Sequence, residues 1–103
     1  MVVAEVSIEP IGTGSPSILD FVTACVELLE KQRDVKYEVT AMGTIIEGDR
    51  KRILTLVDQM HETCLNMGAK RVLTEFRMDE RVDKPLHIDD MEREVQEHLT
   101  KRR

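Results

Sequence analysis

The chain has 103 residues, of which 41% are hydrophobic and 34% charged, and its formal net charge is −5. This composition is typical of one folded domain, which we expect residues 1–103 to form. The acidic balance, with one tyrosine, two phenylalanines and no tryptophan, excludes the basic patch and stacking platform that nucleic-acid binding needs. No apolar stretch is long enough for a membrane span and no signal-peptide pattern is present, so we expect a cytoplasmic protein that binds no membrane.

The first part of the chain predicts a strand followed by a helix. Apolar side chains occupy every even position from 2 to 8, the period of a strand with one buried face, and Pro10 is expected to end it. Residues 11–17 form a turn, with Ser15 as the predicted N-cap and Pro16 as the first helical residue. Apolar residues then recur at helical spacing and predict a buried helix face made by Ile18, Phe21, Val22, Cys25, Leu28 and Leu29.

Residues 35–49 predict a β-hairpin that leads directly into a second helix. Apolar and polar residues alternate over 35–42, Gly43 supplies the turn, and residues 44–47 form a short second strand. Asp49 is the expected N-cap, because its carboxylate accepts hydrogen bonds from the first helical turn, and Gly68 is expected to end the helix in a left-handed conformation. The predicted buried face consists of Ile53, Leu56, Val57, Met60, Cys64 and Met67.

The last part of the chain predicts a strand and a third helix. Side chains alternate over residues 72–79, with Phe76 on the face expected to be buried. Pro85 then interrupts the chain, and Asp89 with Glu92 resembles a capping box at the start of a helix. This helix has a narrow apolar stripe of Met91, Val95 and Leu99.

The predicted order is β-α-β-β-α-β with an extra C-terminal helix, which is the ferredoxin-like arrangement of an α+β protein. Right-handed crossovers would place both long helices on one face of a four-stranded antiparallel sheet and leave the other face open. Glu47 is notable on that open face, because a carboxylate in a sheet needs water, a partner or a ligand. The mixed character of the face favours a ligand site or a subunit interface, and its expected members are Ser7, Glu9, Ile45, Glu47, Glu75 and Arg77.

Other residues with reactive or ligating side chains have structural explanations. His61 and Cys64 have the spacing of two metal ligands on one helix, but no further ligand is near in the sequence, and we expect no metal site. Cys25 and Cys64 lie on apolar helix faces, where reduced cysteines behave as small hydrophobic residues. The turn at residues 12–15 could bind an anion on its backbone N–H groups or simply cap a helix; it lacks the lysine of a P-loop.

Three segments together resemble the thiamine-binding-protein family, a YkoF-like group of small proteins long described as uncharacterised. They are residues 7–13 (SIEPIGT), residues 42–49 (MGTIIEGD) and residues 71–84. The resemblance spans nearly the whole chain, and P-x-G-T followed by M-G-T-x-x-E-G is a fairly specific combination. It implies a ferredoxin-like protomer, assembly into a homotetramer as a dimer of dimers, and binding of thiamine or its hydroxymethylpyrimidine part by some members.

The implied ligand suggests roles for particular residues. Thiamine carries a permanent positive charge that a carboxylate can offset, and its aminopyrimidine offers hydrogen-bond donors and acceptors. We therefore expect Glu47 to be the polar anchor, with no cofactor other than thiamine as a candidate ligand. The other expected ligand-binding residues are Ser7, Glu9 and Thr44 beside the anchor, Thr13 at the mouth of the first loop, and Arg77 orienting an acid.

Two other classes of function are alternatives to small-molecule binding. An enzyme of the acylphosphatase type needs an arginine in the first loop to hold phosphate, and residues 11–17 contain none, so we expect no catalysis. A ligand-sensing or purely structural homo-oligomer is the alternative, because it requires only a subunit interface, with or without a small-molecule cleft.

Overall fold

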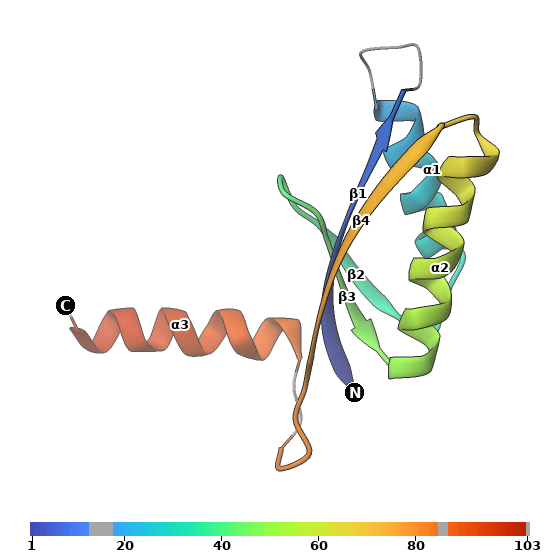
Figure 1. Ribbon diagram of the computed structural model, residues 1–103. Helices are drawn as coiled ribbons and strands as arrows, with labels where there is room; N and C mark the ends of the chain where they lie inside the picture. Colours follow the sequence, from blue (N-terminus) through green and yellow to red (C-terminus); the bar gives the residue numbers. More distant parts are fainter. Residues whose placement is uncertain (13–17, 85–86, 103) are drawn as a thin grey trace.

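The fold is a four-stranded antiparallel sheet with helices on both sides, seen in a computed structural model that describes residues 1–12, 18–84 and 87–102 (Figure 1). The strand order is β2-β3-β1-β4, and β1 pairs antiparallel with both β3 and β4. This order confirms the predicted ferredoxin-like arrangement. The elements are β1 (Val2–Ile11), α1 (Leu19–Glu30), β2 (Lys36–Val39), β3 (Thr44–Gly48), α2 (Arg50–Asn66), β4 (Arg71–Glu80) and α3 (Ile88–Arg102).

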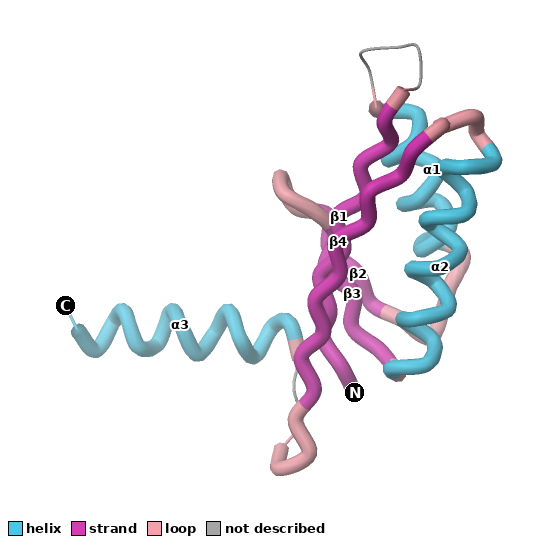
Figure 2. Tube along the Cα trace, in the orientation of Figure 1, coloured by secondary structure: helices cyan, strands magenta, loops and turns pink. Residues whose placement is uncertain are grey.

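The core lies between the sheet and the two helices that cover one of its faces. Figure 2 shows α1 and α2 on the same side of the strands, whereas α3 projects from the other side. Leu29 of α1, Ile46 of β3 and both Ile53 and Leu56 of α2 are completely buried there. The remaining buried members of this core are Val2, Ala4, Val6, Cys25, Val57, Met60 and Cys64.

The strand register decides which side chains face the helices. Val6 lies opposite Phe76 and is part of the core, where Phe76 packs against it. Val3 lies opposite Glu47 and Asp79 on the other face, because successive side chains of a strand alternate. The predicted alternation of the first, third and last strands is therefore confirmed, but the first strand does not end at Pro10 as predicted, since β1 pairs with β4 through Pro10 to Ile11.

Helix α2 begins and ends as the sequence predicts. The Asp49 carboxylate accepts a hydrogen bond from the backbone N–H of Lys51 at 3.2 Å, so Asp49 is the N-cap. Gly68 has a φ of 103°, a conformation that L-residues with a side chain rarely adopt. Met67, which was predicted to be buried, is 42% exposed because the helix ends before it at Asn66.

The hairpin is shorter than predicted, since β2 stops at Val39 and a turn follows. Both the backbone N–H and the hydroxyl of Thr40 donate to the carbonyl oxygen of Gly43, each at 2.8 Å. Gly43 also passes very close to β1: a Cβ atom there would lie 2.8 Å from the carbonyl oxygen of Val6. The turn needs glycine for steric reasons, not for a positive φ.

Two helix starts differ from the sequence prediction. Ser15 and Pro16, the predicted cap and first residue of the first helix, lie outside the described residues, and the described helix begins at Leu19. Ile18 and Val22 were predicted to be buried, but they are 43% and 37% exposed. Helix α3 begins at Ile88, so Asp89 is inside the first turn and is not the N-cap.

Helix α3 extends away from the rest of the protein (Figure 1). The radius of gyration is 15.6 Å, compared with about 13 Å for a compact chain of this length. The apolar stripe of Met91, Val95 and Leu99 is accordingly 38%, 59% and 40% exposed. None of the helices in the described part of the chain has the length and apolar character needed to cross a membrane.

Candidate functional site

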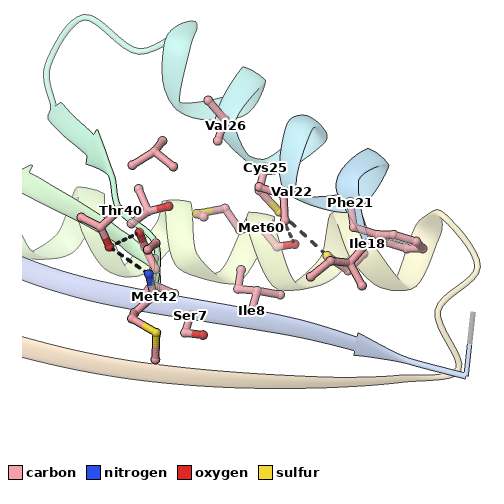
Figure 3. A pocket seen from close by; sticks show the side chains of 16 residues that line it. Ser7, Ile8, Ile18, Phe21, Val22, Cys25, Val26, Thr40, Met42 and Met60 are labelled. Atoms are coloured by element: carbon pink, nitrogen blue, oxygen red, sulfur yellow. Dashed lines mark hydrogen bonds between the residues drawn. The ribbon is translucent and has the colours of Figure 1, made fainter. Parts of the chain in front are cut away.

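A cavity of about 220 Å³ lies between α1, α2, β1 and the β2–β3 hairpin (Figure 3). Helix α1 contributes Phe21 and Cys25, α2 contributes Met60, and the hairpin contributes Thr40 and Thr44. We call this cavity the hairpin cavity.

The lining of the hairpin cavity is apolar and uncharged. Its described lining residues include no acid, lysine, arginine or histidine. The Thr40 hydroxyl is already hydrogen-bonded to the Gly43 carbonyl oxygen. No hydrogen bond joins the Thr44 hydroxyl to another described residue, although Thr44 is only 8% exposed. Thr44 therefore offers a free donor and acceptor to a molecule inside the cavity.

The rim of the hairpin cavity explains why part of α1 is exposed. Ile18 and Val22 border the cavity together with Val39 and Met42, which are 50% and 83% exposed. Clustered exposed apolar residues around a hollow are a feature of binding sites. These residues were predicted from periodicity to be core or strand residues, and periodicity alone cannot distinguish a core residue from one that lines a cavity.

Two cysteines meet in the wall of the cavity. The Sγ atoms of Cys25 and Cys64 are 3.8 Å apart, and Cys25 Sγ lies 3.7 Å from the backbone carbonyl oxygen of Met60 (Figure 3). Both are free thiols, 5% and 1% exposed. Burial, and secondarily the neighbouring Cys64 thiol, raise the pKa of Cys25 to about 12.

The open face of the sheet holds Glu47, as predicted, but its carboxylate already has a partner. Glu47 Oε1 lies 2.5 Å from His87 Nδ1, and only 7% of the Glu47 side chain is exposed. Ile88, at the start of α3, packs on Val3 and Ile45 beside this pair. The buried carboxylate therefore has a hydrogen-bond partner within the chain. His87 was not predicted as a partner of Glu47, because the two residues are 40 positions apart in the chain.

An exposed ion pair adds to the attachment of α3. Lys36 of β2 donates to the Asp89 carboxylate, which lies in the first turn of the helix. The hydrogen bond from Lys36 lowers the pKa of Asp89. Both side chains are more than half exposed, so this pair adds little to stability and serves mainly to orient the helix.

A second, more open hollow of about 400 Å³ lies on the open face between β1, β3, β4 and α3. Arg77 lines it, and the strand register places Arg77 opposite Glu5. Asp79 of β4 and Met91 of α3 line it as well. This second hollow is lined by acidic and basic side chains, whereas the described lining of the hairpin cavity is uncharged.

The residues predicted to bind ligand do not converge on one site. Thr44 and Glu47 are three positions apart in one strand, so they lie on opposite faces of the sheet. Thr44 lines the hairpin cavity. Ser7 also borders this cavity, although the strand register pairs it with Glu75 on the open face. Arg77 lines the second hollow, and Glu47 pairs with His87. Glu9 is exposed and lies opposite Leu73 in the strand register. Thr13 lies outside the described residues.

His61 and Cys64, the pair with metal-ligand spacing, are directed to different partners. His61 Nδ1 is 2.7 Å from the Thr74 hydroxyl, whereas Cys64 contacts Cys25. Among the residues that the structure describes, no group of three or more His, Cys, Asp or Glu side chains is arranged to hold a metal ion.

Several known proteins have similar sequences over most of their length. A UPF0045 protein of Bacillus subtilis is 34% identical over 102 residues, which cover 96% of this chain and 98% of that protein. A UPF0045 protein of Methanocaldococcus jannaschii is 43% identical over 88 residues, covering 85% of each chain. Its crystal structure has a TM-score of 0.85 and 40% identity, covering 93% of this chain and 96% of the other.

A more distant structure has the same fold. It belongs to a Thermotoga maritima protein provisionally assigned to thiamine biosynthesis or salvage, with a TM-score of 0.75 and 19% identity over 87% of this chain and 92% of the other. The sequence model of the family described as "Thiamine-binding protein" matches residues 4–96. Because this match spans most of the chain, the protein belongs to the thiamine-binding-protein family.

Proposed function

We propose that the protein binds the hydroxymethylpyrimidine part of thiamine in the hairpin cavity and catalyses no reaction. The observation that carries this proposal is the chemistry of the cavity: an uncharged, mostly apolar wall that includes the hydroxyls of Thr44 and Ser7, neither of which is hydrogen-bonded to another described residue. Membership of the thiamine-binding-protein family supports the choice of ligand class.

Size and charge favour the pyrimidine ring over intact thiamine as the buried part. Pockets for drug-sized ligands measure about 300–1,000 Å³. The hairpin cavity, at about 220 Å³, is suited to a single ring. A positive charge is costly to bury without a partner, and the described lining contains no carboxylate. If thiamine binds, its thiazolium ring is expected to stay at the exposed rim, in contact with water.

Specific contacts follow from the lining residues. The Thr44 hydroxyl can donate to a pyrimidine nitrogen or accept from the amino group. Phe21 lines the same cavity and supplies an aromatic surface for the ring. In this proposal Thr44 takes the anchoring role that the sequence suggested for Glu47, because the Glu47 carboxylate is bonded to His87 on the opposite face.

Thr44→Val is expected to weaken binding of hydroxymethylpyrimidine about 2- to 10-fold, the loss of one neutral hydrogen bond worth roughly 0.5–1.5 kcal/mol. The change keeps the shape of the side chain and removes only the hydroxyl. Isothermal titration calorimetry on the wild type and the variant measures it. Thr55→Val is the matched control, because Thr55 is exposed on α2 and its hydroxyl donates to the Lys51 carbonyl oxygen outside the cavity.

Glu47→Gln distinguishes the two faces of the sheet. Binding in the hairpin cavity should be unaffected by it, whereas a ligand anchored on the open face would lose roughly 1.5–3 kcal/mol, the value of a hydrogen bond to a charged group. Equal affinity of wild type and Thr44→Val, together with weaker binding by Glu47→Gln, would place the ligand on the open face. If neither hydroxymethylpyrimidine nor thiamine produces heat with the wild type, the structural homo-oligomer becomes the better account.

We also propose that the chain self-associates, as a homotetramer built from two dimers. Two apolar surfaces support this: the stripe of Met91, Val95 and Leu99 on α3, and Leu73 on the open face, all at least 38% exposed. A small chain gains buried area by association. Sedimentation equilibrium at micromolar concentration should give a species of four chains, or at minimum two. A monomer across the whole concentration range would overturn the proposal.

A further inference from the structure

The two thiols of the hairpin cavity are placed to react with each other. Cys25 is on α1 and Cys64 on α2, 39 residues apart in the chain, and their sulfur atoms are 3.8 Å apart. A disulfide has an S–S length of about 2.05 Å, so the two sulfur atoms need to approach by a further ~1.8 Å. The helices already pack against each other. Small side-chain rotations and a slight approach of α1 and α2 are expected to supply this movement.

Access to the pair is through the cavity. Cys25 and Cys64 are 5% and 1% exposed, yet both line the hollow beneath the hairpin. A cavity of about 220 Å³ admits a molecule as small as hydrogen peroxide. A peptide thiol such as glutathione would have to insert its cysteine past the apolar rim residues, so a small hydroperoxide is favoured as the oxidant.

We propose that Cys25 and Cys64 form an intramolecular disulfide when a small hydroperoxide enters the hairpin cavity, and that this disulfide and a bound pyrimidine ring exclude each other. The second half of the proposal rests on the proposed function, whereas the first half does not. Disulfide formation would bring α1 and α2 closer at the wall of the cavity. The space left for a ring would shrink, and a ring already in place would block the peroxide.

The chemistry balances with hydrogen peroxide as the oxidant. One of the two cysteines, as a thiolate, attacks one peroxide oxygen, the O–O bond breaks, and a sulfenic acid and hydroxide form. The sulfur of the other cysteine then attacks the sulfenic sulfur, the S–S bond forms, the S–O bond breaks, and the second hydroxide leaves. The protons of the two thiols convert both hydroxides to water. Two thiols are oxidised by two electrons, and one peroxide is reduced to two waters.

The reaction should be slow at neutral pH. Burial raises the pKa of Cys25 to about 12, and attack on peroxide requires a thiolate, so little of the reactive form of Cys25 is present at neutral pH. Among the described residues that line the cavity, Cys25 and Cys64 are the two with titratable side chains. Disulfide formation is therefore expected to be faster at pH 9 than at pH 7. At neutral pH the disulfide should form during prolonged exposure to peroxide and not during a brief exposure.

The first test uses the reduced 103-residue protein without ligand. Treatment with hydrogen peroxide under native conditions, then alkylation after unfolding and intact-mass measurement, should give a monomeric chain lighter by two hydrogen atoms with neither cysteine alkylated. Cys25→Ala and Cys64→Ala should give no such species. Two added oxygen atoms, a disulfide between chains, or unchanged thiols after prolonged treatment at pH 9 would each overturn the disulfide.

The second test separates the disulfide from the ligand. Calorimetry with hydroxymethylpyrimidine should show binding roughly tenfold or more weaker for the oxidised protein than for the reduced one, because the narrowed cavity is overpacked by the ring. Saturating hydroxymethylpyrimidine should in turn slow the oxidation. Equal affinity of both forms would overturn mutual exclusion. Absence of binding to the reduced protein would overturn the proposed function and mutual exclusion, but not a disulfide established by mass.

Discussion

Leu56→Ala should lower the free energy of unfolding by about 2–5 kcal/mol, the usual cost of a large-to-small change in a core. Leu56 is 0% exposed and lies on α2 beneath the sheet, among core residues contributed by β1 and β3. Truncation removes apolar contacts and leaves a void that close-packed neighbours fill only in part. Urea unfolding at matched protein concentration measures the loss, because self-association would change the apparent stability.

Leu54→Ala is the matched control for this change. It removes the same atoms from the same helix, but Leu54 is 47% exposed and faces away from the core. Its effect should stay within about 0.5 kcal/mol, as for most surface substitutions. Similar losses for Leu54→Ala and Leu56→Ala would mean that α2 is rotated about its axis relative to the sheet, or that Leu54 is buried in a subunit interface. Sedimentation of Leu54→Ala distinguishes these two explanations.

Gly43→Ala should destabilise the protein by about 1–3 kcal/mol, the typical cost of forcing an extra group into a packed position. The added Cβ would lie 2.8 Å from the backbone carbonyl oxygen of Val6. A backbone oxygen in a paired strand cannot move aside without disturbing the β1–β3 register. The same strain would displace the turn that lines the hairpin cavity, so binding of hydroxymethylpyrimidine should weaken as well.

The control for Gly43→Ala is the neighbouring change Met42→Ala. Met42 is 83% exposed, so its truncation should leave stability within about 0.5 kcal/mol. Met42 nevertheless borders the cavity, and some loss of ligand affinity is expected. The result that contradicts this account is a Gly43→Ala variant as stable as the wild type, because the hairpin turn would then lie farther from β1 than the structure places it.

Local patterns were sufficient to predict most of the fold. The Asp49 cap and the glycine at position 68 depend on neighbouring backbone groups, and both were predicted correctly. The alternation of Phe76 with Arg77 assigned the two faces of β4, because the side-chain period of a strand is a property of the strand itself. The length of β2 was overestimated, since Ala41 and Met42 continue the alternation but belong to the turn.

The candidate site was predicted only in part. Thr44 and Ser7 were named from the sequence and do border the hairpin cavity. Phe21 and Cys25 also line it, but helical periodicity assigned them to the core, because core and cavity residues share the same period. Sequence order suggested that Thr44 would lie beside Glu47, whereas the strand directs the two side chains to opposite faces.

The sequence by itself determined the order of the elements and the face that each presents, since these properties arise from interactions within a few residues. Tertiary structure alone decided the contacts between distant residues: the meeting of Cys25 with Cys64, 39 positions apart, and of Glu47 with His87, 40 apart. Such contacts depend on how helices and strands pack, which no local pattern encodes. The hairpin cavity has the same origin, because its wall combines α1, α2, β1 and a turn that are brought together only by the folding of the whole chain.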